Sequence, residues 1–143
     1  MQPEIIIGDY QTLQKECNLI RHLIFVMEQN VPHDLELDDR DAICIHLLLK
    51  LNNDYIATGR IDLEKQGKIG RLAVLASFRN KGYGQIILHN LELIAKENNL
   101  SAVWLNAQKQ TINFYQQSGY IIVGNEFLEA NIIHLKMIKS FSC

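Results

Sequence analysis

Hydrophobic and polar residues follow two spacings in the first third of the chain. The Ile-rich segment Glu4–Gly8 predicts a short strand. Apolar residues at three- and four-residue spacing then predict a helix over residues 10–27. Asp9 can cap this helix through its carboxylate, and the helix must end before Pro32. Its apolar face comprises Leu13, Cys17, Ile20 and Ile24, with Met27 as a further candidate.

Three strands are predicted to follow one another. The acidic segment 35–41 predicts a loop or short turn, and residues 43–51, 55–63 and 69–75 have the composition of strands. Asn52-Asn53-Asp54 suits a tight hairpin turn, and Lys65-Gln66-Gly67-Lys68 reverses the chain again. Strands joined by such short connections imply an antiparallel meander.

Helical spacing returns after residue 75 and alternates with strands. The predicted helices are 84–97 and 111–118, and the predicted strands are 102–107, 120–123 and 132–138. The unit from residue 69 to 107 is strand–helix–strand, which favours a right-handed crossover between parallel strands. We therefore expect one α/β (α+β) domain over residues 1–143. Its central sheet is mixed and mostly antiparallel, with about six to seven strands and about four flanking helices.

The composition is that of an ordinary globular domain. Of 143 residues, 48% are hydrophobic and 21% are charged, and the formal net charge is −2. No basic excess is available to neutralise a nucleic-acid backbone, and no apolar run approaches the roughly 18–20 residues of a membrane span. The N-terminus lacks a signal-peptide pattern, and Cys17, Cys44 and Cys143 show no C-x-x-C spacing. We expect a cytoplasmic protein with reduced thiols, no metal, and neither a nucleic-acid nor a membrane partner.

A basic loop containing glycines leads from a strand directly into a helix. It reads Arg79-Asn80-Lys81-Gly82-Tyr83-Gly84. The first N–H groups of a helix lack an intrahelical acceptor, and the helix dipole favours negative charge there. The glycines let the backbone approach a phosphate, and Arg79 and Lys81 add positive charge. The segment is neither a dinucleotide fingerprint nor a Walker loop, so it predicts either an anion site or an ordinary strand-to-helix turn.

Two blocks resemble the GCN5-related N-acetyltransferase (GNAT) superfamily. Arg79-x-x-Gly82-x-Gly84, following Leu72-x-Val74, resembles its acetyl-coenzyme A motif, and Phe114-Tyr115-Gln116-Gln117-Ser118-Gly119-Tyr120 resembles its later signature. Further blocks across nearly the whole chain, such as Gly70-Arg71-Leu72-Ala73-Val74, are similar to the ElaA/YjcF-like subgroup. Tyr120 departs from the phenylalanine usual there. The resemblance implies the GNAT fold, with a parallel, splayed strand pair and acetyl-coenzyme A as co-substrate.

The resemblance also implies which residues hold coenzyme A. Backbone N–H groups of residues 80–84 would hold its pyrophosphate with help from Arg79 and Lys81, and the pantetheine would pair with the strand at 72–74. The N–H of Val74 would polarise the thioester carbonyl. Gln108 either contacts the coenzyme or caps the following helix. The predicted coenzyme-binding residues are Leu72, Ala73, Val74, Arg79, Asn80, Lys81, Gly82, Tyr83, Gly84, Gln108 and Tyr115.

Tyr115 is predicted to be the general acid that protonates the leaving thiolate, and the alternative is an aromatic ring that only packs beside Phe114. The acidic run at 36–41 either attracts a cationic amine or is a solvated face. The base that takes the proton of the amine is left open among Glu36, Asp38 and His134, with Glu28, Asp41 and His46 as further candidates. The residues expected to contact the acceptor are Glu28, Asp38, Arg60, Glu129 and His134.

These residues lead to one functional prediction and two rivals. We expect an acetyl-coenzyme A-dependent N-acetyltransferase that acts on a primary amine, more readily of a small molecule than of a protein. Nothing in the sequence pairs Cys44 with a base, so direct transfer is favoured over an acyl-cysteine. The rivals are a coenzyme A-binding sensor without catalysis and an interaction module of the same fold. A free strand edge near 132–138 is compatible with either a monomer or a homodimer.

Overall fold

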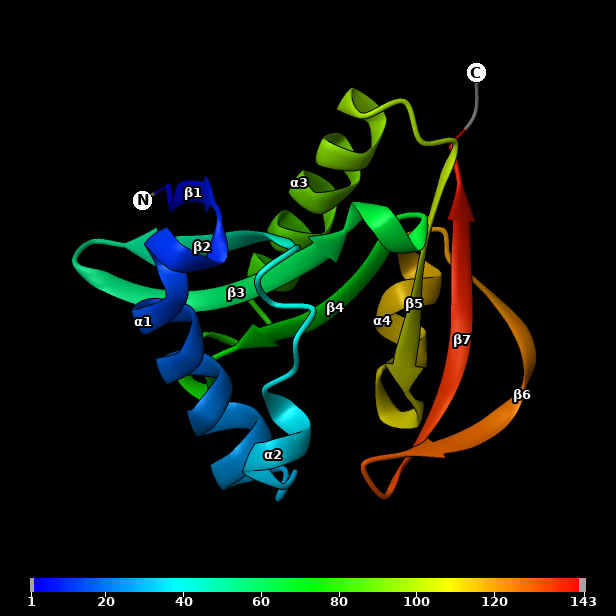
Figure 1. Ribbon diagram of the computed structural model, residues 1–143, viewed down its shortest axis with the longest axis horizontal. Helices are drawn as coiled ribbons and strands as arrows, with labels where there is room; N and C mark the ends of the chain where they lie inside the picture. Colours follow the sequence, from blue (N-terminus) through cyan, green and yellow to red (C-terminus); the bar gives the residue numbers. More distant parts are fainter. Residues whose placement is uncertain (1, 142–143) are drawn as a thin grey trace.

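The computed structural model describes residues 2–141, which form a seven-stranded sheet with helices on both faces (Figure 1). The strands lie in the order β1-β2-β3-β4-β5-β7-β6, and every neighbouring pair is antiparallel except β4–β5. The expected free strand edge near 132–138 was therefore wrong, because that strand pairs on both sides. The strands are β1 (Glu4–Gly8), β2 (Ile45–Leu51), β3 (Asp54–Asp62), β4 (Lys68–Val74), β5 (Ala102–Gln108), β6 (Ile121–Glu129) and β7 (Ile132–Ser140). The α-helices of this part of the chain are α1 (Tyr10–Arg21), α2 (His33–Glu36), α3 (Tyr83–Glu97) and α4 (Ile112–Gln117).

The parallel strands β4 and β5 separate along their length. They pair at Lys68↔Trp104, near the start of each strand. Figure 1 shows them diverging toward their carboxyl ends. The predicted fold class, a mixed and mostly antiparallel sheet with one parallel, splayed pair, is therefore confirmed, and the sheet is open near its middle.

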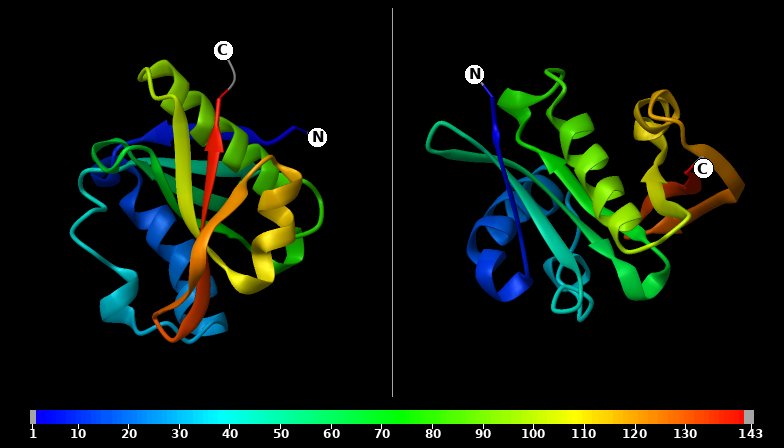
Figure 2. Two further views of the ribbon diagram at one scale, coloured as in Figure 1. Left: turned by 90° about the vertical axis from the view of Figure 1, so that its right-hand side faces the viewer. Right: turned by 90° about the horizontal axis from the view of Figure 1, so that it is seen from above.

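The two faces of the sheet are covered by α1 and α3, as the right-hand view of Figure 2 shows. Strand β2 illustrates how the sequence directs this. Leu47 and Leu49 pack into the core under α3, whereas Leu48 between them packs with the buried side chains of α1. Since successive side chains of a strand point to opposite faces, a continuous apolar strand is expected wherever both faces are covered.

The first helix begins as predicted and then changes its geometry. The Thr12 N–H donates to the Asp9 carboxylate at 2.8 Å, which confirms the predicted cap. From His22 to Glu28 the α-helix continues as a π-helix. The wider turn rotates the following side chains, so Met27 is 65% exposed while Ile24 stays buried. The assignment of Met27 to the apolar face was therefore wrong.

Strand β6 extends well beyond the 120–123 that the sequence predicted. Gly124 has a φ of +87°, and the register between β6 and β7 shifts between Val123 and Phe127. The polar Gly124-Asn125-Glu126 run resembles a turn in sequence but is a bulge within the strand. In the acidic segment predicted as a loop or short turn, one helical turn, α2, follows Pro32.

Two further expectations concern cysteines and membranes. Cys17 and Cys44 are buried free thiols, and Cys143 lies outside the described residues. Of the helices within residues 2–141, none has the length and apolar character to cross a membrane.

Candidate active site

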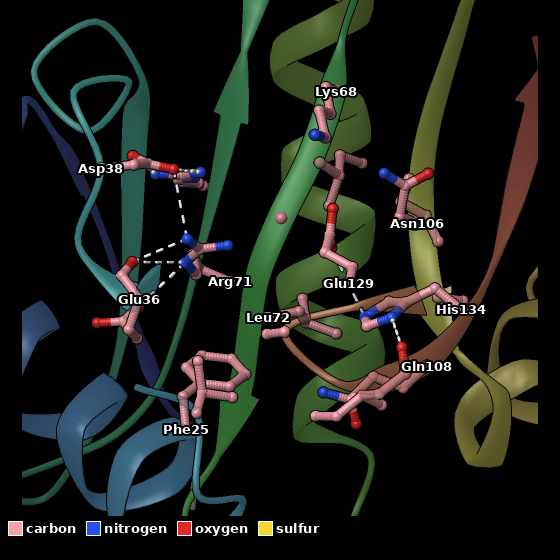
Figure 3. Close-up of a pocket in the computed structure, with 18 of the residues that line it drawn as sticks. Phe25, Glu36, Asp38, Lys68, Arg71, Leu72, Asn106, Gln108, Glu129 and His134 are labelled. Atoms are coloured by element: carbon pink, nitrogen blue, oxygen red, sulfur yellow. Dashed lines mark hydrogen bonds and ion pairs between the residues drawn. The ribbon is translucent and has the colours of Figure 1, made fainter. Parts of the chain in front are cut away.

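A cavity of about 380 Å³ lies where β4 and β5 separate (Figure 3). Its walls come from the π-helix, the segment at 31–40, β3, β4, β5, α4 and the β6–β7 hairpin. It collects these residues that the sequence singled out: Glu36, Asp38, Arg60, Leu72, Gln108, Tyr115, Glu129 and His134. The other predicted residues are not part of its lining, namely Glu28, Asp41, His46, Ala73, Val74 and those of 79–84.

The basic loop ends in a residue with left-handed backbone conformation, and α3 begins directly after it. Gly82 is the N-cap residue with a φ of +88°, and no side chain caps the helix. A Cβ at Gly82 would meet nothing within 4 Å, so this glycine serves the backbone conformation and not packing. A Cβ at Gly84, by contrast, would lie 3.2 Å from the Phe114 ring. The first turn of α3 carries no acidic residue, so its N–H groups can donate hydrogen bonds to an anion.

Arg79 anchors this loop to two other elements. Its guanidinium donates to both Glu28 carboxylate oxygens at 2.7 and 2.9 Å, and its Nε donates to the Val74 carbonyl at 2.8 Å. The hydrogen bond from Arg79 holds the pKa of Glu28 below its usual value. Glu28, predicted as an acceptor contact or a base, therefore lies against the loop and is already paired.

A buried cluster of arginines and carboxylates closes one end of the cavity. Arg21 is 1% exposed and donates to Glu36 at 2.7 Å and to Asp41 at 2.7 Å. Arg60 forms a two-pronged pair with Asp38, both distances being 2.8 Å, and also reaches Asp41. We call Arg21, Glu36, Asp38, Asp41, Arg60 and Arg71 the arginine–carboxylate cluster.

The cluster changes the interpretation of the acidic run. Burial opposes ionisation of Asp38 and Asp41, but the hydrogen bonds and charges of the arginines outweigh it and lower the pKa of each carboxyl. A carboxylate with a lowered pKa and arginine partners is a weak base. His46, another base candidate, is buried outside the cavity with Nε2 2.9 Å from the Asp41 carbonyl, and burial lowers its pKa. Within the acidic run, Glu36, Asp38 and Asp41 are thus paired with arginines, and Glu36 and Asp41 are buried, whereas Asp38 and Asp39 remain exposed to solvent.

His134 stands on the opposite wall in a defined orientation. Its Nδ1 lies 2.7 Å from the Ile132 carbonyl oxygen. Since a carbonyl only accepts, Nδ1 carries a hydrogen, and Nε2 is the ring nitrogen left without a hydrogen bond from a described residue. Nε2 is 3.7 Å from a Glu129 carboxylate oxygen, and the ring stacks on Phe127. Gln108 is the cross-strand neighbour of His134 on β5 and donates to Gln29 at 2.8 Å.

Tyr115 both packs and reaches the cavity. Its ring lies edge-on to Phe114 and Tyr120, at centroid distances of 5.0 and 5.7 Å. Burial raises the pKa of Tyr115, so the phenol keeps its proton at neutral pH. No described residue forms a hydrogen bond with its hydroxyl, whereas the hydroxyl of the neighbouring Tyr120 donates to Glu92 at 2.8 Å.

Sequence reasoning did not assign several residues that line the cavity. They include Phe25, Lys68, Arg71 and Asn106. Phe25 reaches it through the π-helix, and Arg71 lies at a bulge in β4 with a φ of +52°. Neither irregularity has a local sequence signal, although Arg71 belongs to the Gly70–Val74 block that resembled the family.

Comparison with known proteins identifies the family. The family described as "Acetyltransferase (GNAT) domain" matches residues 43–141. The chain is 35% identical over 136 residues to the uncharacterized N-acetyltransferase YjcF of Bacillus subtilis, covering 94% of this chain and 97% of YjcF. The crystal structure of Escherichia coli ElaA superposes with a TM-score of 0.86 at 27% identity, covering 96% of this chain and 99% of ElaA.

A more distant structure was solved with acetyl coenzyme A. It is a Bacillus anthracis protein classed as a streptothricin acetyltransferase, with a TM-score of 0.62 and 21% identity. The match covers 69% of this chain and 63% of that one. The fold, the predicted resemblance and the sequence relatives agree: the chain belongs to the GNAT family of acetyltransferases.

Proposed function

We propose that the protein transfers the acetyl group of acetyl-coenzyme A directly to the primary amine of a small molecule. The observation that carries the proposal is that an uncapped helix N-terminus follows a strand end that has no neighbour on one side. The uncapped N-terminus of α3 follows the carboxyl end of β4, and that end of β4 has lost β5 as its neighbour. A coenzyme with a pyrophosphate and an extended amide chain matches both.

The hydrogen bonds at the end of β4 support the assignment of Val74. Leu75 N–H donates to the Ile56 carbonyl of β3 at 2.9 Å. Successive N–H groups of an extended chain point to opposite edges, so the Val74 N–H is directed toward the gap between β4 and β5. A donor held there can stabilise negative charge that develops on a carbonyl oxygen in the gap.

The charges of the loop also fit an anionic coenzyme. Lys81 has no ion-pair partner within residues 2–141, and the charge of Arg79 is matched by Glu28. We therefore assign the electrostatic contribution to Lys81 and to the α3 N-terminus. Arg79 would hold the loop against the end of β4. The acetyl coenzyme A in the B. anthracis neighbour supports the same choice of co-substrate.

The residues of the cavity can complete the proton transfers. Acetyl-coenzyme A supplies the acetyl group as a thioester. The free Nε2 of His134 would take the proton of the attacking amine as the new C–N bond forms. The Tyr115 hydroxyl, whose raised pKa keeps it protonated, would give its proton to the sulfur as the C–S bond breaks. We favour His134 over Glu36 and Asp38 as the base because arginines already hold both carboxylates.

The cysteines favour direct transfer over an acyl-enzyme. Burial raises the pKa of both described thiols, and that of Cys44 reaches about 11. Neither is therefore a thiolate at neutral pH, which is the form that attacks a thioester. Neither Cys17 nor Cys44 lines the cavity.

Two assays test the proposed function together. Calorimetry should show that acetyl-coenzyme A and coenzyme A bind with micromolar dissociation constants. Release of free thiol should then depend on a primary amine, in a panel of amino sugars, polyamines, amino acids and peptides. Absence of coenzyme binding would refute the proposal. Binding without turnover on any amine would favour the rival, a coenzyme A-binding sensor.

A further inference from the structure

The cavity contains more positive than negative charge once its internal ion pairs are matched. Arg40 pairs with Asp62 at 2.7 Å, outside the arginine–carboxylate cluster. Within the cluster, three arginines face three carboxylates. The cavity residues left over are Lys65, Lys68 and Glu129.

Lys68 is a half-buried cation without a counterion. Within residues 2–141 it forms no ion pair, and its Nζ lies 5.2 Å from the centroid of the Trp104 ring. Burial lowers the pKa of Lys68, while the charge of Glu129 raises it without coming within ion-pair distance. A desolvated ammonium of this kind gains most from an anionic ligand.

A bulge in β4 brings Arg71 onto the same face as Lys68. Thr58 pairs with Ala73 and Arg60 pairs with Gly70, so Gly59 alone faces two residues of β4. Ile69 and Leu72, three positions apart, therefore pack into the same core under α3. By the same shift, Lys68 and Arg71, also three positions apart, both face the cavity.

Arg71 is held in place with part of its guanidinium free. Its Nε and Nη2 donate to Glu36 and Asp38, at distances between 2.8 and 3.3 Å. No described residue accepts a hydrogen bond from its Nη1. Figure 3 shows the Arg71 guanidinium beside Glu36 and Asp38, with Glu129 and His134 across β4 from it. A guanidinium fixed in this way recognises a planar carboxylate at little cost in side-chain entropy.

We propose that the acceptor is an amino acid or a similar amine that carries a carboxylate. Lys68 and the free Nη1 of Arg71 bind the carboxylate, and His134 and Glu129 receive the amine. The sequence left open whether the acidic run attracts a cationic amine or is a solvated face, whereas the structure pairs Glu36, Asp38 and Asp41 with arginines and leaves cations for the ligand. The proposal rests on the proposed function, because it assigns the second substrate of the same site.

Matched acceptors test the proposal. Each amino acid of a panel is compared with its amide and with its decarboxylated amine, using acetyl-coenzyme A and wild-type protein. We expect kcat/KM for the amino acid to exceed that for either analogue by about tenfold or more, as for a hydrogen-bonded charge. Binding of the same compounds to the protein saturated with coenzyme A is measured by NMR titration, so that a result does not depend on turnover.

Two variants locate the preference. Lys68→Gln should raise KM for the amino acid about tenfold. The ratio of kcat/KM for the amino acid to kcat/KM for the amide should fall accordingly. Lys136→Gln is the matched control, because the Lys136 Nζ also lies over the Trp104 ring, at 4.6 Å, but Lys136 does not line the cavity. It should leave the preference unchanged.

The outcomes separate this inference from the proposed function. Amides or decarboxylated amines acetylated as well as the amino acids would overturn the inference and leave the acetyltransferase standing. The inference would also be overturned if Lys68→Gln raised KM equally for the amino acid and for its amide. It would be overturned as well if no amino acid of the panel bound to the protein saturated with coenzyme A. Lys68-dependent binding of amino acids without turnover would support the carboxylate site and refute the proposed function.

Discussion

The gap between β4 and β5 has two ends that differ in construction: the end that we propose binds coenzyme A (the coenzyme end) and the end that we propose binds the amine (the acceptor end). At the coenzyme end, one contiguous stretch, residues 79–84, turns into α3 and offers backbone N–H groups. At the acceptor end, side chains converge from segments far apart in sequence, such as Glu36, Arg71, Gln108 and His134. One site is a local backbone conformation, and the other is a product of the whole topology.

Because of this difference, related proteins can keep the same coenzyme site while their acceptor sites differ. A backbone site depends on glycine and on helix geometry, and it constrains few side chains. A site made of side chains can change its ligand through single substitutions while the fold persists. Membership of the GNAT family therefore supports the coenzyme assignment more strongly than any acceptor assignment.

The largest expected effect is that of a substitution at Tyr115, which lines the cavity. Tyr115→Phe should lower kcat by roughly 10²–10⁴-fold, because it removes the proton donor to the leaving sulfur. The dissociation constant of coenzyme A should change little, as measured by calorimetry. Tyr120→Phe is the matched control, since its hydroxyl bonds to Glu92 and not to the cavity. A Tyr115→Phe enzyme with wild-type kcat would remove the general acid from the mechanism.

The next effect concerns the stability of the acceptor end. Arg21→Ala leaves Glu36 and Asp41 without a buried partner and should lower the free energy of unfolding by about 3–5 kcal/mol. Urea denaturation measures it. Glu28→Gln breaks the exposed pair with Arg79 and should cost only about 0–1 kcal/mol. Equal losses for the two variants would contradict the distinction between the buried cluster and the surface pair.

Acid should destabilise the same cluster. The pKa values of Asp38 and Asp41 are lowered in the folded state, so the unfolded chain binds protons first as the pH falls. Their contribution to stability is present above the unfolded pKa of about 4 and is lost as the pH falls below it toward the folded values. Unfolding free energies measured between pH 6 and pH 2 should decline, and less steeply in Arg21→Ala. If the unfolding free energy of Arg21→Ala declined with pH as steeply as that of the wild-type protein, the arginine–carboxylate cluster would not be the source of the acid sensitivity.

The smallest effect tests the backbone character of the coenzyme end. Gly82→Ala forces an alanine into a left-handed conformation, at a cost of about 1–2 kcal/mol, and should weaken coenzyme A binding up to roughly tenfold. Gly124→Ala imposes the same strain in β6, where φ is +87° and nothing lies within 4 Å of the added Cβ. It should leave the affinity unchanged. Equal affinities in both variants would show that the turn at Gly82 does not shape the coenzyme site.

The sequence predicted those features that depend on local patterns. Strand and helix order followed from apolar spacing, the Asp9 cap from its residue type, and the loop before α3 from its glycines. The residues that line the cavity could not be predicted from the sequence, because their positions depend on the π-helix after Arg21 and on the bulge at Arg71. Both insert one residue into a regular repeat and shift which side chains face inward, which packing decides and periodicity does not show.

Charge illustrates the same limit. The sequence shows acids at 36–41 and arginines scattered over 21–71, with no sign that they pair. Only the folded chain places Arg21, Arg60 and Arg71 around three carboxylates. As a result Lys68, an ordinary surface residue by its sequence, becomes one of the charges of the cavity that no ion pair matches.

Direct transfer of an acetyl group is the central claim, and one measurement tests it most directly. The protein is mixed with isotopically labelled acetyl-coenzyme A and the amine panel, and mass spectrometry follows the label on both the acceptor and the intact protein during the first turnover. The account predicts a labelled N-acetyl product with no labelled protein at any time. Label that appears first on the protein, or on no amine while coenzyme A binds, would contradict it.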